Sequence, residues 1–460
     1  MRPNLLILLT DQQHTNTLGC YGNSVIRTPH VDRLASEGAT FERHYVSIPL
    51  CVPSRASLWS SQYPHYNGVM VNDDGRSIAL PDEVPTLGDV AKAAGYVCGY
   101  IGKWHIGREG TPQHGFTDAW WTHLRGSYEQ SLEESGQTTF DPGITRGSQR
   151  GIVSFELAHD TVVASKTIEF IHQHKDEPFA CVCSMRAPHD PFSGPFNDLY
   201  APADVSLPST LNETFANKPH AQRRGVPRQW FEQWIVAPDN TLRYDELRRI
   251  IARYWGLAHL IDVNVGRVLQ TLDELELNER TIVLFMSDHG DQMGHHGLFA
   301  KGLFMYDDST RVPCIMRWTN HIPAGRRVPH LTSMVDVVPT LLELAGLGAP
   351  RTMQGQSMRQ LWDYAYNRRD AVFMEMFEAY GCPSPIFSVR TERWKYNWYV
   401  ADQDELYDMT DDPYETRNLA PERQHRDTLL GLRYRILRWL EETSDVRMTT
   451  LARITPSIPL

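Results

Sequence analysis

No apolar run of transmembrane length occurs in the 460 residues of the chain. The short apolar run Leu5–Leu9 is followed by Thr10 and Asp11, and it is shorter than the core of a signal peptide. We therefore expect a protein that has no membrane partner and is cytoplasmic.

Dense runs of basic residues are also lacking. The chain has 45 Lys and Arg against 56 Asp and Glu, which gives a formal net charge of −11. A surface of this sign repels the phosphate backbone of nucleic acids, so we expect no nucleic-acid partner.

Cysteines are few, and their number, seven, is odd. They are Cys20, Cys51, Cys98, Cys181, Cys183, Cys314 and Cys382. These positions show no disulfide-framework spacing, which is typical of a reducing compartment and agrees with a cytoplasmic location.

The segment Leu50–Val69 combines a thiol, a guanidinium and several small hydroxyls in a short stretch. Pro53 disfavours helix at the residue before it, so we expect the helix to begin only after Arg55. Cys51 would then lie at or just before a helix N-terminus, where an anion and an ionised side chain are favoured. The alternative is that Cys51 is a small buried apolar residue, as most unpaired cysteines are.

Four continuous apolar runs have the character of strands buried on both faces. They are Leu5–Leu9, Tyr96–Ile101, Phe179–Met185 and Thr281–Met286. Helical patterns alternate with them, including a long one over Tyr244–Leu275. This order predicts an α/β domain with a mainly parallel, mixed central sheet sandwiched by helices.

The pattern changes near Asp370, where short strands and turns replace the long runs. The expected strands are Phe387–Arg390, Trp394–Val400 and Glu405–Tyr407, followed by a helix over Gln424–Leu440. We therefore predict a catalytic domain over residues 1–366 and a smaller C-terminal α+β domain over residues 367–460, with an antiparallel sheet, a helix and a tail.

Polar residues follow each of the four apolar runs: Asp11, Lys103, His189 and Asp288. Since ligands bind at the carboxyl ends of strands in open α/β sheets, these residues are expected at one rim. Two carboxylates brought together there would repel unless a cation lies between them.

Gln12 and His289 stand beside those aspartates and could add an amide oxygen and an imidazole nitrogen. A mostly oxygen ligand set favours calcium or magnesium, and His289 leaves room for manganese. The alternative is that Asp11 and Asp288 only cap the turns that follow them.

Five cationic or ionisable side chains would surround the same place in an otherwise acidic chain: Arg55, Lys103, His105, His189 and Lys301. A cationic site in an acidic protein implies an anionic substrate group. Individually, Lys103 could be a solvated turn residue and His189 a hydrogen-bonded loop histidine. His295 and His296 are expected to be exposed loop residues.

The segment CVPSR with the downstream ASL resembles the sulfatase signature, in which the cysteine is oxidised to formylglycine after synthesis. Further similar segments follow in family order: NLLILLTDQ, TPHVDRLASEGATF, GKWHIG, APHDPF, SDHGD, RTERWKYN and LYDMTDDPYETRNLA. They span nearly the whole chain. The sequence is therefore identified as a member of the sulfatases of the alkaline-phosphatase superfamily.

This resemblance implies one divalent metal, calcium before manganese or magnesium, with the ligands Asp11, Gln12, modified Cys51, Asp288 and His289. It also implies two groups of catalytic residues. Arg55, Lys103 and His105 would steady the formylglycine, while His189 and Lys301 would hold the sulfate and the leaving oxygen. A hydroxyl of the aldehyde hydrate would attack sulfur, and His189 would protonate the departing alkoxide.

Two departures from the family pattern keep alternatives open. Ser60 and Ser61 replace the usual Thr-Gly of the signature, which could weaken recognition by the formylglycine-generating enzyme, the expected maturation partner. The metal set also resembles that of choline-sulfatases and phosphonate monoester hydrolases, so a phosphonate monoester or phosphodiester remains an alternative substrate. Lys103 and His105 resemble the sulfatase pair and favour sulfate. The third hypothesis is that the chain is a non-catalytic homologue that binds an anion or a glycan.

The substrate could be an alkyl, aryl or carbohydrate sulfate ester. Trp120, Trp121 and the loops over Phe192–Val236 could form an aromatic platform for a sugar, although such tryptophans also pack within their own domain. The apolar tail Leu451–Leu460 is poorly suited to solvent. We therefore expect this tail to pack across the subunit interface of a homo-oligomer.

Overall fold

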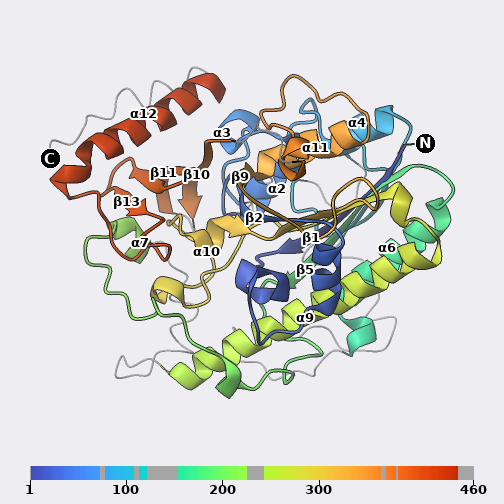
Figure 1. Ribbon diagram of the computed structural model, residues 1–460, viewed down its shortest axis with the longest axis horizontal. Helices are drawn as coiled ribbons and strands as arrows, with labels where there is room; N and C mark the ends of the chain where they lie inside the picture. The colour runs from blue at the N-terminus through green and yellow to red at the C-terminus, as the bar shows by residue number, and fades with distance from the viewer. Residues whose placement is uncertain are drawn as a thin grey trace.

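The computed structural model describes residues 2–72, 78–107, 113–121, 154–224, 243–363, 369–379 and 382–443. Two units lie side by side (Figure 1), a larger one built on a nine-stranded sheet and a smaller one built on a four-stranded sheet. The α/β architecture with a smaller antiparallel unit is as predicted.

Parallel strands form one half of the large sheet. They are, in spatial order, β4 (Asp118–Trp121), β3 (Val97–Gly102), β5 (Phe179–Pro188), β1 (Asn4–Asp11) and β6 (Thr281–Ser287). All four strands expected from apolar runs are among them. Their buried sequences fit central parallel strands, which are covered by helices on both faces.

The other half of the sheet was not anticipated. It contains β8 (Cys314–Arg317), which is antiparallel to β6, followed by β2 (Ala39–Tyr45), β7 (Arg311–Val312) and β9 (Arg326–Ser333). These strands make the sheet mixed, since β9 is parallel to β2 while β7 and β8 are antiparallel to it.

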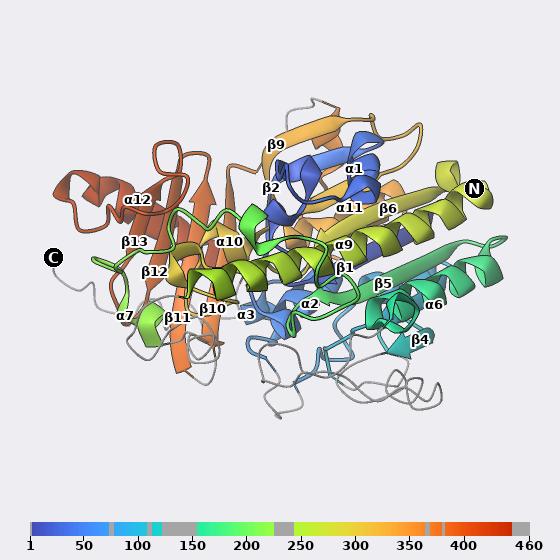
Figure 2. The ribbon, with the colours of Figure 1, turned by 90° about the horizontal axis from the view of Figure 1, so that it is seen from below.

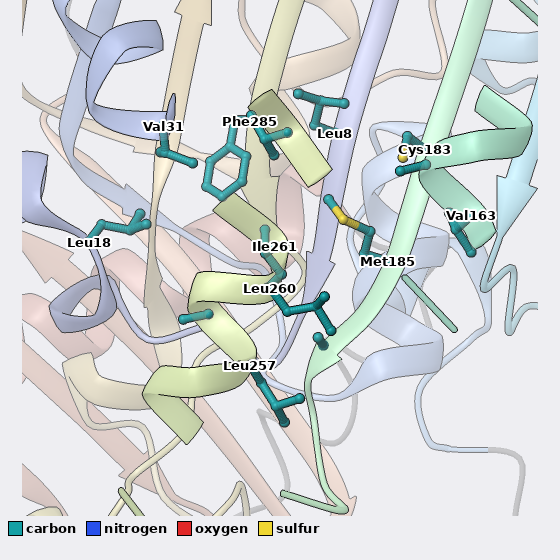
Figure 3. Packing of buried hydrophobic residues seen from close by; sticks show 14 of the residues in the cluster. Leu8, Leu18, Val31, Val163, Cys183, Met185, Leu257, Leu260, Ile261 and Phe285 are labelled. Carbon is teal, nitrogen blue, oxygen red and sulfur yellow. The ribbon is translucent and has the colours of Figure 1, made fainter. Parts of the chain in front are cut away.

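Alternate residues of β1 face opposite layers of the core. Leu6 and Leu8 belong to a buried cluster with α1 (Pro29–Ser36), α6 (His159–His174) and α9 (Tyr244–Glu274), whose packing Figure 3 shows. Leu5, Ile7 and Leu9 belong to a second cluster with α2 (Cys51–Ser60), α4 (Leu87–Ala93) and α11 (Val337–Leu344). The sheet is therefore sandwiched by helices, as predicted.

The smaller sheet is antiparallel, with the order β10 (Ala371–Ala379), β11 (Cys382–Thr391), β12 (Trp394–Tyr399) and β13 (Glu405–Asp408). The expected C-terminal helix is α12 (Arg426–Thr443), which buries Leu429, Leu432, Ile436 and Leu440 in the same cluster as strand residues. Figure 2 shows α12 beside the strands of this sheet, where it contacts β11 and β12. Short helices of the described chain include α3 (Pro64–Asn67), α7 (His220–Arg224) and α10 (Asp307–Thr310).

Two predictions fall on residues outside the described ranges. The boundary between residues 366 and 367 lies within the gap at 364–368 and stays a prediction, and the tail Leu451–Leu460 follows the last described residue, Thr443. Among the described residues, no helix combines the length and the apolar character that a membrane span requires.

Candidate active site

The four polar residues predicted to share a rim lie at the ends of four adjacent parallel strands. Asp11 is the last residue of β1, and Lys103, His189 and Asp288 directly follow β3, β5 and β6. Because these strands are parallel neighbours, their carboxyl ends meet at one edge of the sheet. The prediction of a common rim is confirmed.

Cys51 is the first residue of α2 and not a residue ahead of it. The expectation that Pro53 delays the helix is wrong, because Pro53 is third in the helix, where its missing N–H would have had no helical partner. Cys51 is 1% exposed, yet its surroundings are polar. Its Sγ lies 3.0 Å from Lys301 Nζ and 3.1 Å from His289 Nε2.

These neighbours set the ionisation of the thiol. Burial alone would raise the pKa of Cys51, but the charges of Lys103, Lys301 and His289 outweigh burial and hold it well below its ordinary value. The helix N-terminus acts in the same direction. Cys51 is therefore a polarised group in a cationic environment rather than an inert apolar residue.

Asp11, Cys51, Asp288 and His289 place their ligand atoms within 4.8 Å of one another, and all four side chains are buried. Burial and the proximity of Asp11 raise the pKa of Asp288. Two buried carboxylates at this separation need a cation to stay ionised. The donor set of two carboxylates, an imidazole and the position-51 side chain therefore fits a divalent metal ion.

Gln12 joins this cluster through its backbone and its side chain. Its N–H donates to Asp288 Oδ1 over 3.0 Å, and its Oε1 accepts from Lys301 Nζ over 2.6 Å. The structure thus brings together all five residues that sequence reasoning named as metal ligands.

Arg55 is fully buried and supports the site from α2. Its Nε donates to Asp288 Oδ2 over 2.8 Å, and its Nη1 donates to the carbonyl of Lys103 and the hydroxyl of Ser184. Lys103 Nζ contacts the carboxylate of Asp11. These cations help to hold the pKa of Asp11 below its ordinary value, against the opposing effects of burial and Cys51.

His105 and His189 differ in their protonation. Burial lowers the pKa of His105 to about 4, and Lys103 adds to this effect. Burial would also lower the pKa of His189, but the carboxylates of Asp190 and Asp11 outweigh it and raise the pKa to about 9. Near neutral pH the rim therefore holds one neutral imidazole, which can accept a proton, and one imidazolium, which can donate one.

The expectation that His295 and His296 are exposed is wrong. His296 is 1% exposed, its Nδ1 contacts the carboxylate of Glu213, and its ring stacks on Tyr306. His295 Nδ1 lies 3.4 Å from Asp308 Oδ1. Their partners are distant in sequence, so the pattern GHHG alone could not reveal them.

A second histidine cluster adjoins the site, where His14 Nε2 lies 2.8 Å from Asp308 Oδ1 and its ring stacks on His295. His14, His295 and Asp308 have the spacing of metal ligands. However, His14 Nδ1 accepts the N–H of Asn16 over 2.9 Å. The proton of neutral His14 is therefore on Nε2, and the cluster is hydrogen-bonded rather than ligating.

Sequence reasoning missed several residues that support the site. Ser184 on β5 contacts Arg55, Tyr254 on α9 donates to the Gln12 carbonyl over 2.6 Å, and Asp291 accepts from Gln12 Nε2. Asp291 could have been noticed, because it ends the SDHGD segment. Nothing in the sequence around Ser184 or Tyr254 distinguishes them from neighbouring core residues. Trp120 and Trp121 lie in β4, but their side chains fall outside the described part of the chain.

Comparison with known proteins agrees with this geometry. Residues 3–347 match the sulfatase family model, and residues 294–442 match the C-terminal model of N-sulphoglucosamine sulphohydrolase. The uncharacterized sulfatase YidJ of Escherichia coli strain K12 is 30% identical, with 96% of this chain and 88% of that protein covered. N-acetylglucosamine-6-O-sulfatase of Bacteroides thetaiotaomicron is 27% identical, with 91% and 82% covered.

A solved structure of similar shape is the phosphonate monoester hydrolase of Agrobacterium radiobacter. It has a TM-score of 0.81 and 25% identity, with 96% of each chain covered. The family model covers most of the chain, including every residue named at the rim. This chain therefore belongs to the sulfatase family.

Proposed function

We propose that the protein hydrolyses a sulfate ester of a small molecule or a carbohydrate, with a formylglycine derived from Cys51 as the nucleophile. The observation that carries this proposal is the position of Cys51. Its buried Sγ lies at a helix N-terminus, within 3.1 Å of Lys301 and His289 and beside Asp11.

Asp11, Gln12, Asp288 and His289, together with modified Cys51, would hold one divalent ion, and calcium suits this mainly oxygen donor set best. Such an ion would supply Lewis acidity that lowers the pKa of a hydroxyl bound to it. The formylglycine hydrate would supply two hydroxyls on one carbon, one to attack sulfur and one whose deprotonation allows sulfate to leave. Unmodified cysteine or serine has no such second hydroxyl.

The chain's own residues would handle charge and protons. Lys103 and Lys301 would neutralise the charge that develops on the sulfate oxygens. His189, whose pKa is raised to about 9, would donate a proton to the departing alkoxide oxygen. His105, whose pKa is lowered to about 4, would accept a proton from the second hydroxyl. Arg55 would keep Asp288 and α2 in place through its three hydrogen bonds.

A phosphonate monoester is the second candidate substrate, since the phosphonate monoester hydrolase of Agrobacterium radiobacter shares the fold. Lys103 and His105, which lie at the end of β3 beside Asp11 and Cys51, resemble the pair found in sulfatases, and this resemblance favours sulfate. N-acetylglucosamine-6-O-sulfatase is similar over most of its length, which supports a carbohydrate sulfate as the ester.

The proposal is tested by measuring kcat/KM on a matched aryl sulfate and aryl phosphonate monoester, for the wild type and Cys51→Ala. We expect a clear preference for the sulfate. We also expect Cys51→Ala to reduce turnover by at least roughly 1,000-fold, since removal of a nucleophile leaves only binding and electrostatic effects. Cys20→Ala, at a half-buried position away from the rim, is the matched control and should retain activity.

Mass spectrometry of the peptide that contains residue 51 completes the test. The aldehyde should be present in protein co-expressed with a formylglycine-generating enzyme and absent without one. Full activity of a protein whose Cys51 remains a thiol would refute the mechanism, and a preference for the phosphonate would overturn the substrate assignment.

A further inference from the structure

Asp291 is a buried carboxylate for which the mechanism above has no use. It is 0% exposed and stands three residues after Asp288, in the loop that follows β6. A buried ionisable group needs partners that compensate for its loss of hydration, so its contacts indicate its role.

The two carboxylate oxygens of Asp291 bind two different segments. Oδ2 accepts from Gln12 Nε2 over 2.5 Å, just after the end of β1. Oδ1 accepts from the backbone N–H groups of Met293 and Ala300, over 2.8 and 2.9 Å. Ala300 immediately precedes Lys301, so one side chain connects Gln12 with the loop that carries Lys301.

The side-chain amide of Gln12 lies between this carboxylate and an ammonium group. Its Oε1 accepts from Lys301 Nζ over 2.6 Å, while its Nε2 donates to Asp291. A lysine ammonium can only donate and a carboxylate can only accept, so a single orientation of the amide satisfies both neighbours. That orientation turns the amide oxygen toward Lys301 Nζ, which also lies 3.0 Å from Cys51 Sγ.

The backbone on both sides of these bonds is strained. Gln12, Met293 and Ala300 have φ angles of 65°, 41° and 54°, in the left-handed region that non-glycine residues rarely adopt. Such a residue is unfavourable and persists only where surrounding contacts hold it. The hydrogen bonds to Asp291 are contacts of this kind, because they involve all three strained residues.

We propose that Asp291 is a positioning residue that presents the amide oxygen of Gln12 to the metal ion and fixes the loop of Lys301. This inference rests on the proposed function, since it assumes that Gln12 is a metal ligand. It assigns Asp291 a role distinct from that of Asp288 and His289, because Asp291 acts through Gln12 and not on the ion.

The test is a double-mutant cycle of Asp291→Asn and Gln12→Glu, with Ca²⁺ affinity measured by calorimetry on the full chain. Asp291→Asn keeps an oxygen for Met293 and Ala300 but turns an NH₂ group toward Gln12 Nε2, so the Gln12 amide must rotate. We expect the Kd for Ca²⁺ to rise roughly 10–100-fold, as for other residues that orient metal ligands.

Gln12→Glu alone places two carboxylates against each other and should also weaken Ca²⁺ binding. In the double variant, one oxygen of the carboxylate introduced at position 12 can accept a hydrogen bond from the NH₂ group introduced at position 291. The other oxygen of that carboxylate is then available to the ion. We therefore expect the double variant to bind Ca²⁺ more tightly than either single variant, which a role limited to holding the loop would not produce.

The inference would be overturned if Asp291→Asn bound Ca²⁺ with the Kd of the wild type, or if the double variant bound Ca²⁺ no more tightly than the single variants. If Asp291→Asn does not fold, the comparison of the double variant with Gln12→Glu gives the same decision. Binding is measured without turnover, on protein with unmodified Cys51. A wild type that binds Ca²⁺ but hydrolyses no sulfate ester after Cys51 has been converted to formylglycine refutes the proposed function alone, whereas one that binds neither Ca²⁺ nor Mn²⁺ in either form overturns both.

Discussion

Ser61 occupies a position where the family signature usually has glycine, and its backbone shows why glycine is usual. Its φ and ψ are 53° and 36°, the left-handed conformation at the C-terminal cap of α2. Its hydroxyl donates to the carbonyl of Val335 over 2.6 Å and accepts the N–H of Gly355 over 3.2 Å. These two bonds compensate for the unfavourable backbone and connect α2 to the segments on both sides of α11, through Val335 before it and Gly355 after it.

We predict that Ser61→Ala lowers the free energy of unfolding by about 1–3 kcal/mol, because the buried carbonyl of Val335 and the half-buried N–H of Gly355 lose their partner. Ser61→Gly should cost roughly 1 kcal/mol less, since glycine adopts the left-handed conformation without strain. Urea denaturation of the two variants measures the difference. An alanine variant as stable as the wild type would contradict this account of the departure.

Individual site residues were predictable where a strand end determined their position. Asp11 and Asp288 follow continuous apolar runs, and the parallel sheet brings such ends together whatever the loops do. His295 and His296 were misjudged because their burial depends on Glu213, Tyr306 and Asp308, which reach them only in the folded protein. Contacts made by loops carry no periodic signal in the sequence.

At the scale of elements, a buried aspartate of helix α9 forms hydrogen bonds with the first turn of helix α1. Asp262 of α9 is buried, and its Oδ1 accepts from the backbone N–H groups of His30 and Val31, over 3.0 and 2.8 Å. Burial raises the pKa of Asp262 to about 7. The folded protein therefore binds a proton here at pH values where the unfolded chain has lost it.

This difference predicts how stability depends on pH. The contribution of Asp262 is fully present below about pH 4, the pKa in the unfolded chain, and is lost as the pH rises toward 7. Asp262→Asn keeps an acceptor oxygen and cannot ionise. We expect the free energy of unfolding of the wild type, relative to Asp262→Asn, to fall between pH 4.5 and 8. The fall should be up to roughly 1.4 kcal/mol for each unit by which the pKa of Asp262 in the folded protein exceeds its pKa in the unfolded chain.

Chemical denaturation at several pH values measures this difference. Asp245→Asn is the control, because Asp245 lies on the same helix with its side chain 95% exposed. If the free energies of unfolding of the wild type and Asp262→Asn differ by the same amount at every pH, the carboxyl of Asp262 is ionised over the whole range from pH 4.5 to 8, and the prediction is wrong.

The elements themselves were predictable to unequal degrees. The buried central strands and the long helix α9 have continuous or periodic apolar patterns, and both were found. Strand β2 was missed because the half-buried Glu42 and Arg43 interrupt it, and β8 because it has only four residues. Short strands near a sheet edge are defined mainly by their partners, which a single sequence does not show.

At the scale of the whole molecule, the two sheets share buried contacts. Tyr45, Ile48 and Leu50 of the larger unit lie in one apolar cluster with residues of β10 and β11. Beside this cluster, Lys395 of β12 is fully buried, with Nζ 2.9 Å from Asp307 Oδ1 and 2.7 Å from Glu415 Oε1. Asp307 begins α10, shortly after Lys301, so this ion pair connects the smaller sheet to the active-site loop.

We predict that Lys395→Met lowers the free energy of unfolding by about 3–5 kcal/mol, because it leaves the buried carboxylate of Glu415 without its cationic partner. Arg393→Met, which removes a mostly exposed partner of Asp408, is the control and should change stability little. Denaturation followed by fluorescence and by circular dichroism should give one coincident transition for the wild type. Two separate transitions would show that the smaller unit unfolds independently.

The burial of Cys51 also limits when its thiol can be oxidised. In the finished protein its side chain is enclosed by residues from β1 and from the segment after β6, and β6 begins only at Thr281. On the proposed mechanism, the enzyme that oxidises the thiol must reach it before these segments close. At synthesis rates of roughly 5–20 residues per second, that interval lasts roughly 10–50 s on the ribosome. The fraction of active molecules would then be decided by competition between oxidation and folding during translation.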